Sequence, residues 1–114
     1  MEQILQQTLL YDFYGELLTE HQQNVYEQVV LNDLSYSEAA SELGISRQGV
    51  HELIKRCNKI LESYEARLHL VERFLGIREN VRKIQELSVR WKEKSGEEPA
   101  GQIYLIAERI LEEL

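Results

Sequence analysis

The sequence predicts an all-α protein: a helix-turn-helix bundle with long C-terminal helices. Apolar residues recur three and four positions apart along most of the chain, whereas strand-like alternation bounded by turn residues is missing. One proline and six glycines in 114 residues leave long stretches free to be helical. We expect a helix-turn-helix domain over residues 1–63 and a helical extension over residues 64–114, which would serve as a dimerisation or packing arm.

Two helices are expected before the turn motif. The apolar residues of the first cover a wide arc, which predicts a helix buried on most of its circumference. They are Ile4, Leu5, Leu9, Leu10, Phe13, Tyr14, Leu17 and Leu18. Thr19 and Gln22 form a capping box that starts a second helix through Val30, and Asn32 and Asp33 end it.

Residues 38–49 have the features of two short helices joined by a tight turn. Ser35 caps the first helix, with Glu38 three residues on as its reciprocal partner. Gly44 supplies the left-handed residue that ends this helix, and Ser46 caps the next one. This pattern predicts a helix-turn-helix, the unit that places its second helix in the major groove of DNA.

Beyond the turn, apolar residues form a heptad seam over about 26 residues. The seam consists of Val50, Ile54, Cys57, Leu61, Tyr64, Leu68, Val71 and Leu75. Such a helix would be about 39 Å long, and its seam packs on a helix of the same chain or of a second copy. We expect a homodimer with an interface formed by Leu61, Tyr64, Leu68, Val71, Leu75 and Trp91.

The pattern then changes phase. It is offset by two residues after Gly76, which predicts a break or bend between two helices there. Residues 95–101 contain Gly96, Pro99 and Gly101 and are expected to form a loop. A last amphipathic helix is predicted over residues 103–114.

The second helix of the motif carries polar residues suited to DNA. They are Ser46, Arg47, Gln48, His51, Lys55, Arg56 and Lys59. Arginine pairs with guanine and glutamine with adenine through two hydrogen bonds each, so we expect Arg47, Gln48, His51 and Lys55 to contact bases. The others would hold phosphates. The alternative interpretation is that these side chains are only the solvent side of a helix.

The charge distribution opposes strong DNA binding. The net charge is −7, and residues 1–34 contain six acidic residues and no lysine or arginine, which gives −6. Residues 35–61 contain four basic and three acidic residues, which gives +1. Because DNA affinity comes largely from neutralised phosphates, we expect weak binding by each subunit, assisted by dimerisation or by a partner.

Enzyme chemistry has little support in the sequence. His21, His51 and His69 lack the close helical spacing of a metal site. Cys57 lies on the heptad seam, which favours a small buried apolar group over a nucleophile. A glycine-rich phosphate-binding loop is also missing. We therefore expect a protein that is not an enzyme and that uses neither a metal nor a cofactor.

The compartment is inferred from three observations. Apolar runs stay well short of the roughly 20 residues of a membrane span, so we expect no membrane insertion. The N-terminus lacks the positive start of a signal peptide, and a single cysteine excludes an internal disulfide framework. A cytoplasmic location follows.

Several segments together resemble the YlxM family of small bacterial helix-turn-helix proteins, whose turn region is similar to the promoter-reading domain of sigma factors. The segments are residues 10–19, 32–38, 46–50 and 54–56. The resemblance implies a DNA-binding or regulatory protein and a link to the signal recognition particle, because the family's genes tend to lie beside that of the particle's GTPase. A rival interpretation is an accessory protein that binds this GTPase or the particle's RNA and uses the helix-turn-helix as a scaffold. Gly49 departs from the family pattern, in which alanine is expected.

Overall fold

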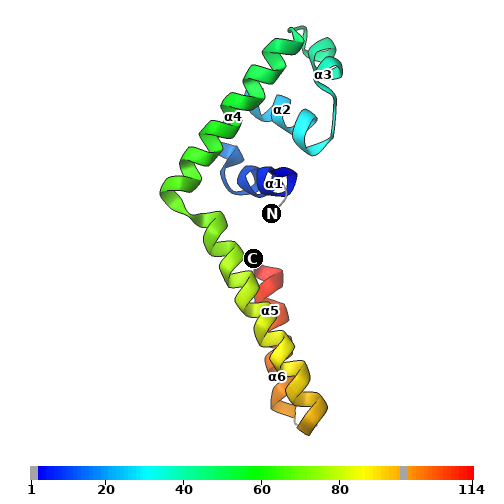
Figure 1. The fold of residues 1–114 in the computed structure, drawn as a ribbon, viewed down its shortest axis with the longest axis vertical. Coiled ribbons are helices and arrows are strands. Elements are labelled where there is room, and N and C mark those ends of the chain that lie inside the picture. The colour runs from blue at the N-terminus through cyan, green and yellow to red at the C-terminus, as the bar shows by residue number, and fades with distance from the viewer. Residues whose placement is uncertain (1–2, 96–97) are drawn as a thin grey trace. The chain divides into compact units, whose positions relative to one another are not determined.

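The computed structural model describes residues 3–95 and 98–114, and every regular element in these ranges is helical (Figure 1). The predicted all-α fold with long C-terminal helices is therefore confirmed. The elements are α1 (Gln3–Tyr14), the 3₁₀ turn η1 (Gly15–Leu17), α2 (Glu20–Tyr26), the π-helical turn η2 (Glu27–Leu31), α3 (Tyr36–Leu43), α4 (Arg47–Leu68), α5 (Leu70–Ser95) and α6 (Glu98–Glu113).

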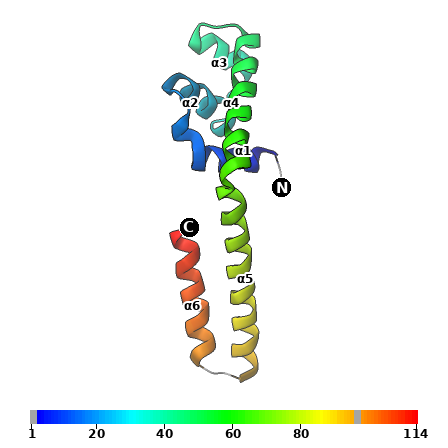
Figure 2. The same ribbon diagram turned by 90° about the vertical axis from the view of Figure 1, so that its left-hand side faces the viewer.

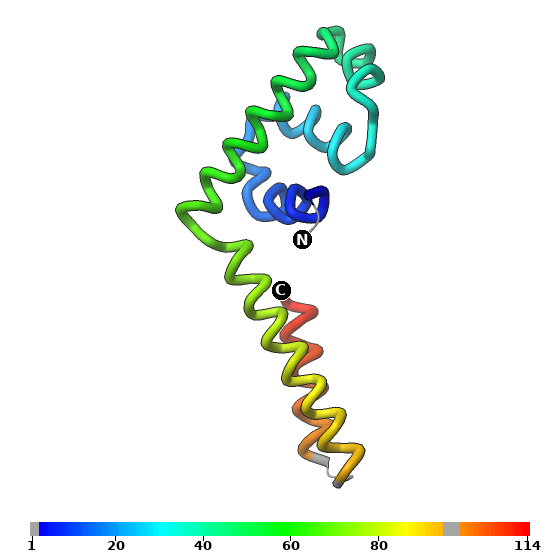
Figure 3. Tube along the Cα trace, in the orientation of Figure 1, coloured from blue at the N-terminus to red at the C-terminus, as the bar shows by residue number. Residues whose placement is uncertain are grey.

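The chain divides into two compact units, residues 1–71 and 72–114. In the first unit α4 is the central element, and α1, α2 and α3 each pack against it (Figure 3). The fully buried side chains of its core include Tyr14, Val25, Tyr26, Val50 and Leu61. The expected domain boundary after residue 63 falls within α4, and the division between the two compact units lies between Val71 and Glu72, three residues after the end of α4 at Leu68.

The first helix is less buried than expected. In α1 only Leu10 and Tyr14 are buried, and Leu18 follows them just beyond the 3₁₀ turn. Ile4 and Leu5, near the start of the helix, are exposed. The helix packs against α4 and η2, which cover only part of its circumference, so the wide apolar arc of its sequence leaves apolar side chains on the surface of the unit.

The second predicted helix begins where its capping box indicates. The Gln22 backbone N–H donates to Thr19 Oγ1 over 3.2 Å, and the Thr19 N–H donates to Gln22 Oε1 over 2.9 Å. Its second half changes into the π-helical turn η2. Asp33, with a φ of 56°, then turns the chain toward α3.

The predicted long seam helix is broken, and not at Gly76. α4 ends at Leu68, His69 takes the left-handed conformation with a φ of 56°, and α5 starts at Leu70 and continues through Gly76. The Leu70 N–H donates to the Tyr14 hydroxyl over 3.1 Å, and the Val71 N–H donates to Glu65 Oε1 over 3.0 Å. These side chains satisfy the first N–H groups of α5, which have no acceptor within their own helix.

Tyr14 and Glu65 are also joined to each other. The Tyr14 hydroxyl donates to Glu65 Oε1 over 2.5 Å, and burial, followed by this hydrogen bond, raises the pKa of Tyr14. We call Tyr14, Glu65 and the two N–H groups of Leu70 and Val71 the junction network. It connects α1, the last turn of α4 and the first turn of α5.

The second unit is a helical hairpin in which α5 and α6 run antiparallel, side by side (Figure 2). Val81 and Ser88 of α5 and Ala100 and Ala107 of α6 are its buried side chains among those described. α6 begins at Glu98, so Pro99 and Gly101 are helical rather than part of the expected loop. Proline is accepted there because the first turn needs no N–H donor. Gly96 lies outside the described residues.

In the part of the chain that the structure describes, no helix combines the length and the hydropathy needed to cross a membrane.

Candidate nucleic-acid interface

The predicted turn has the geometry of a helix-turn-helix. Ser35 Oγ accepts from the Glu38 N–H over 3.1 Å at the start of α3, and Gly44 ends this helix with φ 69° and ψ 27°. Ser46 Oγ accepts from the Gly49 N–H over 2.9 Å at the start of α4. These hydrogen bonds fix the turn between the two helices and therefore the direction in which α4 begins.

Gly49 has a local reason for lacking a side chain. A Cβ at this position would lie 3.2 Å from Ser46 Oγ and 3.8 Å from Ile45 Cδ1. The first distance is tighter than ordinary van der Waals contact. Glycine therefore leaves room for the hydroxyl that caps α4, in exchange for its lower helix propensity.

The seven predicted DNA-contacting residues are all exposed, at the start of α4 or further along it. They are Ser46, Arg47, Gln48, His51, Lys55, Arg56 and Lys59. Val50, Ile54 and Cys57 are buried on the opposite side of the same helix. Burial of this stripe holds α4 in one rotational position, so the polar side chains project away from the core.

Three of these residues come together with one that the sequence analysis did not select. Arg47, Gln48 and His51 line a shallow recess with Tyr36, the first residue of α3. The rings of Tyr36 and His51 lie 5.5 Å apart and are inclined by 58°. Tyr36 directly follows the Ser35 cap, which would have placed it at the start of α3, but its contact with α4 depends on how the two helices cross.

An acidic side chain lies within the same surface. Gln48 Nε2 donates to Glu52 Oε1 over 3.1 Å, one helical turn away. This hydrogen bond occupies part of the donor capacity of Gln48, and the carboxylate adds negative charge where phosphates would approach. Glu52 therefore opposes anion binding at this face.

The remaining basic residues do not form one cluster. Lys55 and Lys59 are four residues apart and share the exposed side of α4. Arg56 instead lines a groove that includes Thr19 and Gln22, from the start of α2, together with Glu52. Its side chain is thus on the α2 side of α4, away from the recess beside Tyr36.

Cys57 is fully buried, and burial raises the pKa of its thiol to about 11. A thiol of raised pKa is a weak nucleophile at neutral pH. Within residues 3–95 and 98–114, His, Cys, Asp and Glu side chains do not gather in threes where a metal ion could bind.

The six positions expected at a dimer interface are divided between the two units. Leu61 and Val71 are buried in the first unit, and Tyr64 stacks on Tyr14 with ring centres 6.1 Å apart. Leu68 is exposed. In the second unit, Leu75 is half-buried and Trp91 is exposed. Their common role in dimerisation stays a prediction.

Comparison with known proteins places this geometry in a family context. Residues 1–98 match the model of the UPF0122 family, described as "Putative helix-turn-helix protein, YlxM / p13 like". A UPF0122 protein of Caldanaerobacter subterraneus subsp. tengcongensis is 47% identical over 79 residues, which are 69% of this chain and 68% of that protein. One of Desulforamulus reducens is 40% identical over 93 residues, or 82% of this chain and 78% of its own.

Proposed function

Because this chain belongs to the UPF0122 family of YlxM/p13-like helix-turn-helix proteins, we propose that it is a DNA-binding regulatory protein of the cytoplasm. The observation that carries the proposal is the recess at the start of α4, where Arg47, Gln48 and His51 are exposed beside Tyr36. In this role Arg47 and Gln48 contact base edges in the major groove.

The helix start adds a second element of recognition. The Ser46 hydroxyl and the first N–H groups of α4 suit a phosphate oxygen, and Lys55 and Lys59 lie further along the exposed side of the helix. Few basic residues are involved, and Glu52 lies among them. Each subunit therefore binds DNA weakly and with a shallow dependence on salt.

Selection of genomic DNA fragments on the purified full-length protein at low salt tests this role. We expect enrichment of a defined sequence, and we expect Arg47→Ala and Gln48→Ala to lower affinity for it by about 10- to 100-fold each, the worth of one bidentate base contact. Lys59→Ala should weaken binding to all sequences equally. Failure of the wild-type protein to enrich any sequence would refute the proposal.

A second candidate function is supported by the acidic first third of the chain. Glu16, Glu20 and Glu27 are exposed around α2, and residues 1–34 carry a charge of −6. Such a surface repels nucleic acid and attracts a basic protein. The family resemblance suggests a component of the signal recognition particle pathway, and the charge favours its GTPase over its RNA.

Pull-down from a nuclease-treated lysate separates the two functions. If the acidic surface binds the targeting GTPase, the wild-type chain recovers it, and a variant with Glu16→Gln, Glu20→Gln and Glu27→Gln loses it. Arg47→Ala serves as the matched control, because it alters the DNA-facing recess and leaves the acidic residues intact. Recovery that does not respond to the glutamine substitutions would contradict this function.

A further inference from the structure

The hairpin of the second unit has one apolar face. Along α5, Ile84, Leu87 and Trp91 are exposed on one flank of the buried line through Val81 and Ser88. Along α6, the corresponding flank of the line through Ala100 and Ala107 also carries large apolar residues. They are Ile103, Ile106 and Ile110. The six side chains are between 36% and 62% exposed.

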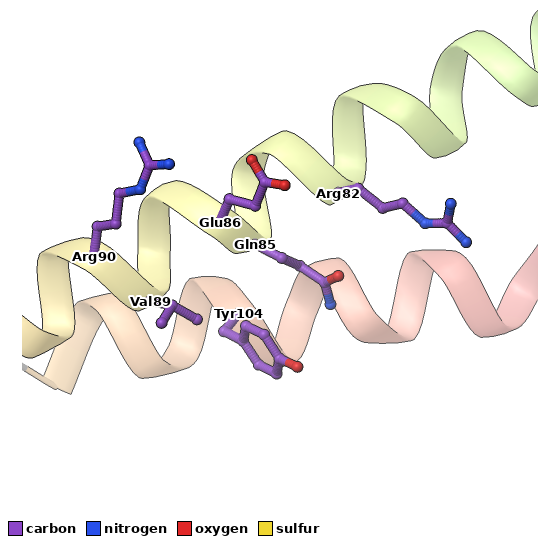
Figure 4. Close-up of a pocket in the computed structure, with 6 residues that line it drawn as sticks. All are labelled: Arg82, Gln85, Glu86, Val89, Arg90 and Tyr104. Carbon is purple, nitrogen blue, oxygen red and sulfur yellow. The ribbon is translucent and has the colours of Figure 1, made fainter.

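The flank of α5 with Leu87 and the flank of α6 with Ile106 lie on the same side of the hairpin. This follows because the second flank of α5 and the second flank of α6 meet on the opposite side. Arg82, Glu86 and Val89 of α5 line a recess with Tyr104 of α6 (Figure 4). Successive residues of a helix are rotated by about 100°, so the flank with Leu87 and the flank with Ile106 both face the other way. We call the six residues Ile84, Leu87, Trp91, Ile103, Ile106 and Ile110 the apolar face.

The opposite side is more polar, although Val89, Tyr104 and Leu105 are exposed there. In Figure 4 the charged groups of Glu86 and Arg90 extend above α5, whereas that of Arg82 extends from α5 toward α6, and all three residues are exposed. Gln85 Nε2 donates to Glu108 Oε2 over 2.6 Å and joins the two helices on this side. The apolar face has six large apolar side chains along one flank of each helix, whereas Val89, Tyr104 and Leu105 on the opposite side lie among charged and polar residues.

The residues of the apolar face form pairs at equal heights along the hairpin. The bond from Gln85 to Glu108, and the contact of Lys92 with Gly101, fix the register of α6 against α5. In this register Ile84 is level with Ile110, Leu87 with Ile106, and Trp91 with Ile103. A second hairpin turned by 180° about an axis parallel to the helices would place α6 of one copy opposite α5 of the other. Each residue of the apolar face would then lie opposite its pair partner in the second copy, for example Ile84 opposite Ile110.

The net charges of the two helices favour the same arrangement, with α5 of one copy opposite α6 of the other. α5 carries seven basic and four acidic residues, which gives +3, whereas α6 carries one basic and four acidic residues, which gives −3. Placing α5 of one copy opposite α6 of the other sets opposite charges side by side. Placing α5 opposite α5 would set like charges together.

The size of the face is adequate for a dimer. α6 has 16 residues, so the face is about 24 Å long and about 20 Å wide across two helices, or about 500 Å² in projection. Side-chain relief makes the accessible area larger than the projection. A specific interface buries about 600 Å² or more on each side, which this face reaches when a second copy covers it.

We propose that the apolar face is the site where two copies of this chain associate, with α5 of each copy against α6 of the other in an antiparallel four-helix bundle. Both copies of α5 then begin at the same end of the bundle, so both helix-turn-helix units are connected to that end. If the proposed DNA-binding function holds, its sites have two-fold symmetric halves. The association itself does not depend on that function.

Sedimentation equilibrium of the full-length chain with matched glutamate variants tests the proposal. We expect a dimer at micromolar concentration and an increase of about 100-fold or more in the dissociation constant for Leu87→Glu, because the substitution would bury a charge. Leu105→Glu is the matched control: Leu105 lines a second recess on the polar side, and both leucines are 62% exposed. It should leave the dimer intact. Ile106→Glu repeats the test from α6.

Crosslinking tests the pairing of the helices. Chains with Leu87→Cys and chains with Ile106→Cys, carrying different tags, are mixed and treated with a short bismaleimide. The wild-type chain, whose single cysteine is buried, gives the background. We expect mixed crosslinks in preference to crosslinks between two copies of the same variant.

Three results would overturn the proposal. The first is a wild-type chain that stays monomeric at about 50 µM, far above the dissociation constants of stable dimers. The second is equal dissociation of the dimer by Leu105→Glu and by Leu87→Glu. The third is crosslinking confined to copies of the same variant. The first would leave the face to a different protein.

Discussion

Replacing Tyr14 by phenylalanine should destabilise the first unit, because it removes the side-chain hydroxyl and leaves the ring in place. The Tyr14 side chain is 1% exposed, so the phenylalanine ring would fill the same space. Its hydroxyl donates to Glu65 Oε1 and accepts from the Leu70 N–H. The substitution removes these two hydrogen bonds of the junction network. The third hydrogen bond, from the Val71 N–H to Glu65, is kept.

The expected loss follows from these two bonds. A hydrogen bond to a charged group contributes about 1.5–3 kcal/mol, and a buried group left without an acceptor adds a cost. Leu70 is partly exposed, so water can replace the lost acceptor of its N–H. We therefore expect a loss of about 2 kcal/mol, which for a unit of 71 residues lowers the melting temperature by about 8–16 °C.

Urea and thermal unfolding followed by circular dichroism measure this loss, and amide exchange at Leu70 and Val71 locates it. Tyr64→Phe is the control, because Tyr64 stacks on Tyr14 and no hydrogen bond of its hydroxyl occurs within the described residues. It should change stability by less than about 0.5 kcal/mol. Equal effects of the two substitutions, or no effect of Tyr14→Phe, would show that the hydroxyl does not stabilise the junction.

Three further substitutions have defined outcomes. Ser46→Ala removes the acceptor of the Gly49 N–H and should lower the free energy of unfolding by about 1 kcal/mol, measured in urea; an unchanged midpoint would contradict the capping role. Glu52→Gln removes the acidic group beside Gln48 and should strengthen DNA binding at low salt, an effect that screening abolishes near 1 M salt, where the Debye length is about 3 Å. Cys57 has a pKa of about 11 in the folded chain against an ordinary value of 9.0, so the unfolded chain releases this proton first and stability falls as pH rises from 9 to 11. Unfolding at several pH values should show that the advantage of wild type over Cys57→Ala shrinks across this range, and a constant difference would refute the linkage.

The features that the sequence predicted correctly depend on neighbouring residues. The caps at Thr19, Ser35 and Ser46 each join groups three residues apart, and Gly44 acts through its own backbone. The exposure of the polar side of α4 was likewise predictable, because the helical spacing of Val50, Ile54 and Cys57 indicates which side of the helix is buried.

The features that could not be predicted depend on distant contacts. The break at His69 is stabilised by Tyr14, which lies 56 residues before Leu70 in sequence. The heptad pattern continues through this break without a change, and it favours one long helix. The place of Tyr36 beside His51, and the burial of α1 on only part of its circumference, depend in the same way on how the helices cross.

The junction network also sets the minimum length of chain that can close the first unit. Glu65 and the N–H groups of Leu70 and Val71 all precede the boundary between the two units. A chain ending at residue 63 would lose the carboxylate and leave the Tyr14 hydroxyl buried without its acceptor. A chain ending a few residues after Val71 would keep the whole network, and the helix-turn-helix could then be studied without the hairpin, free of the association that we assign to the apolar face.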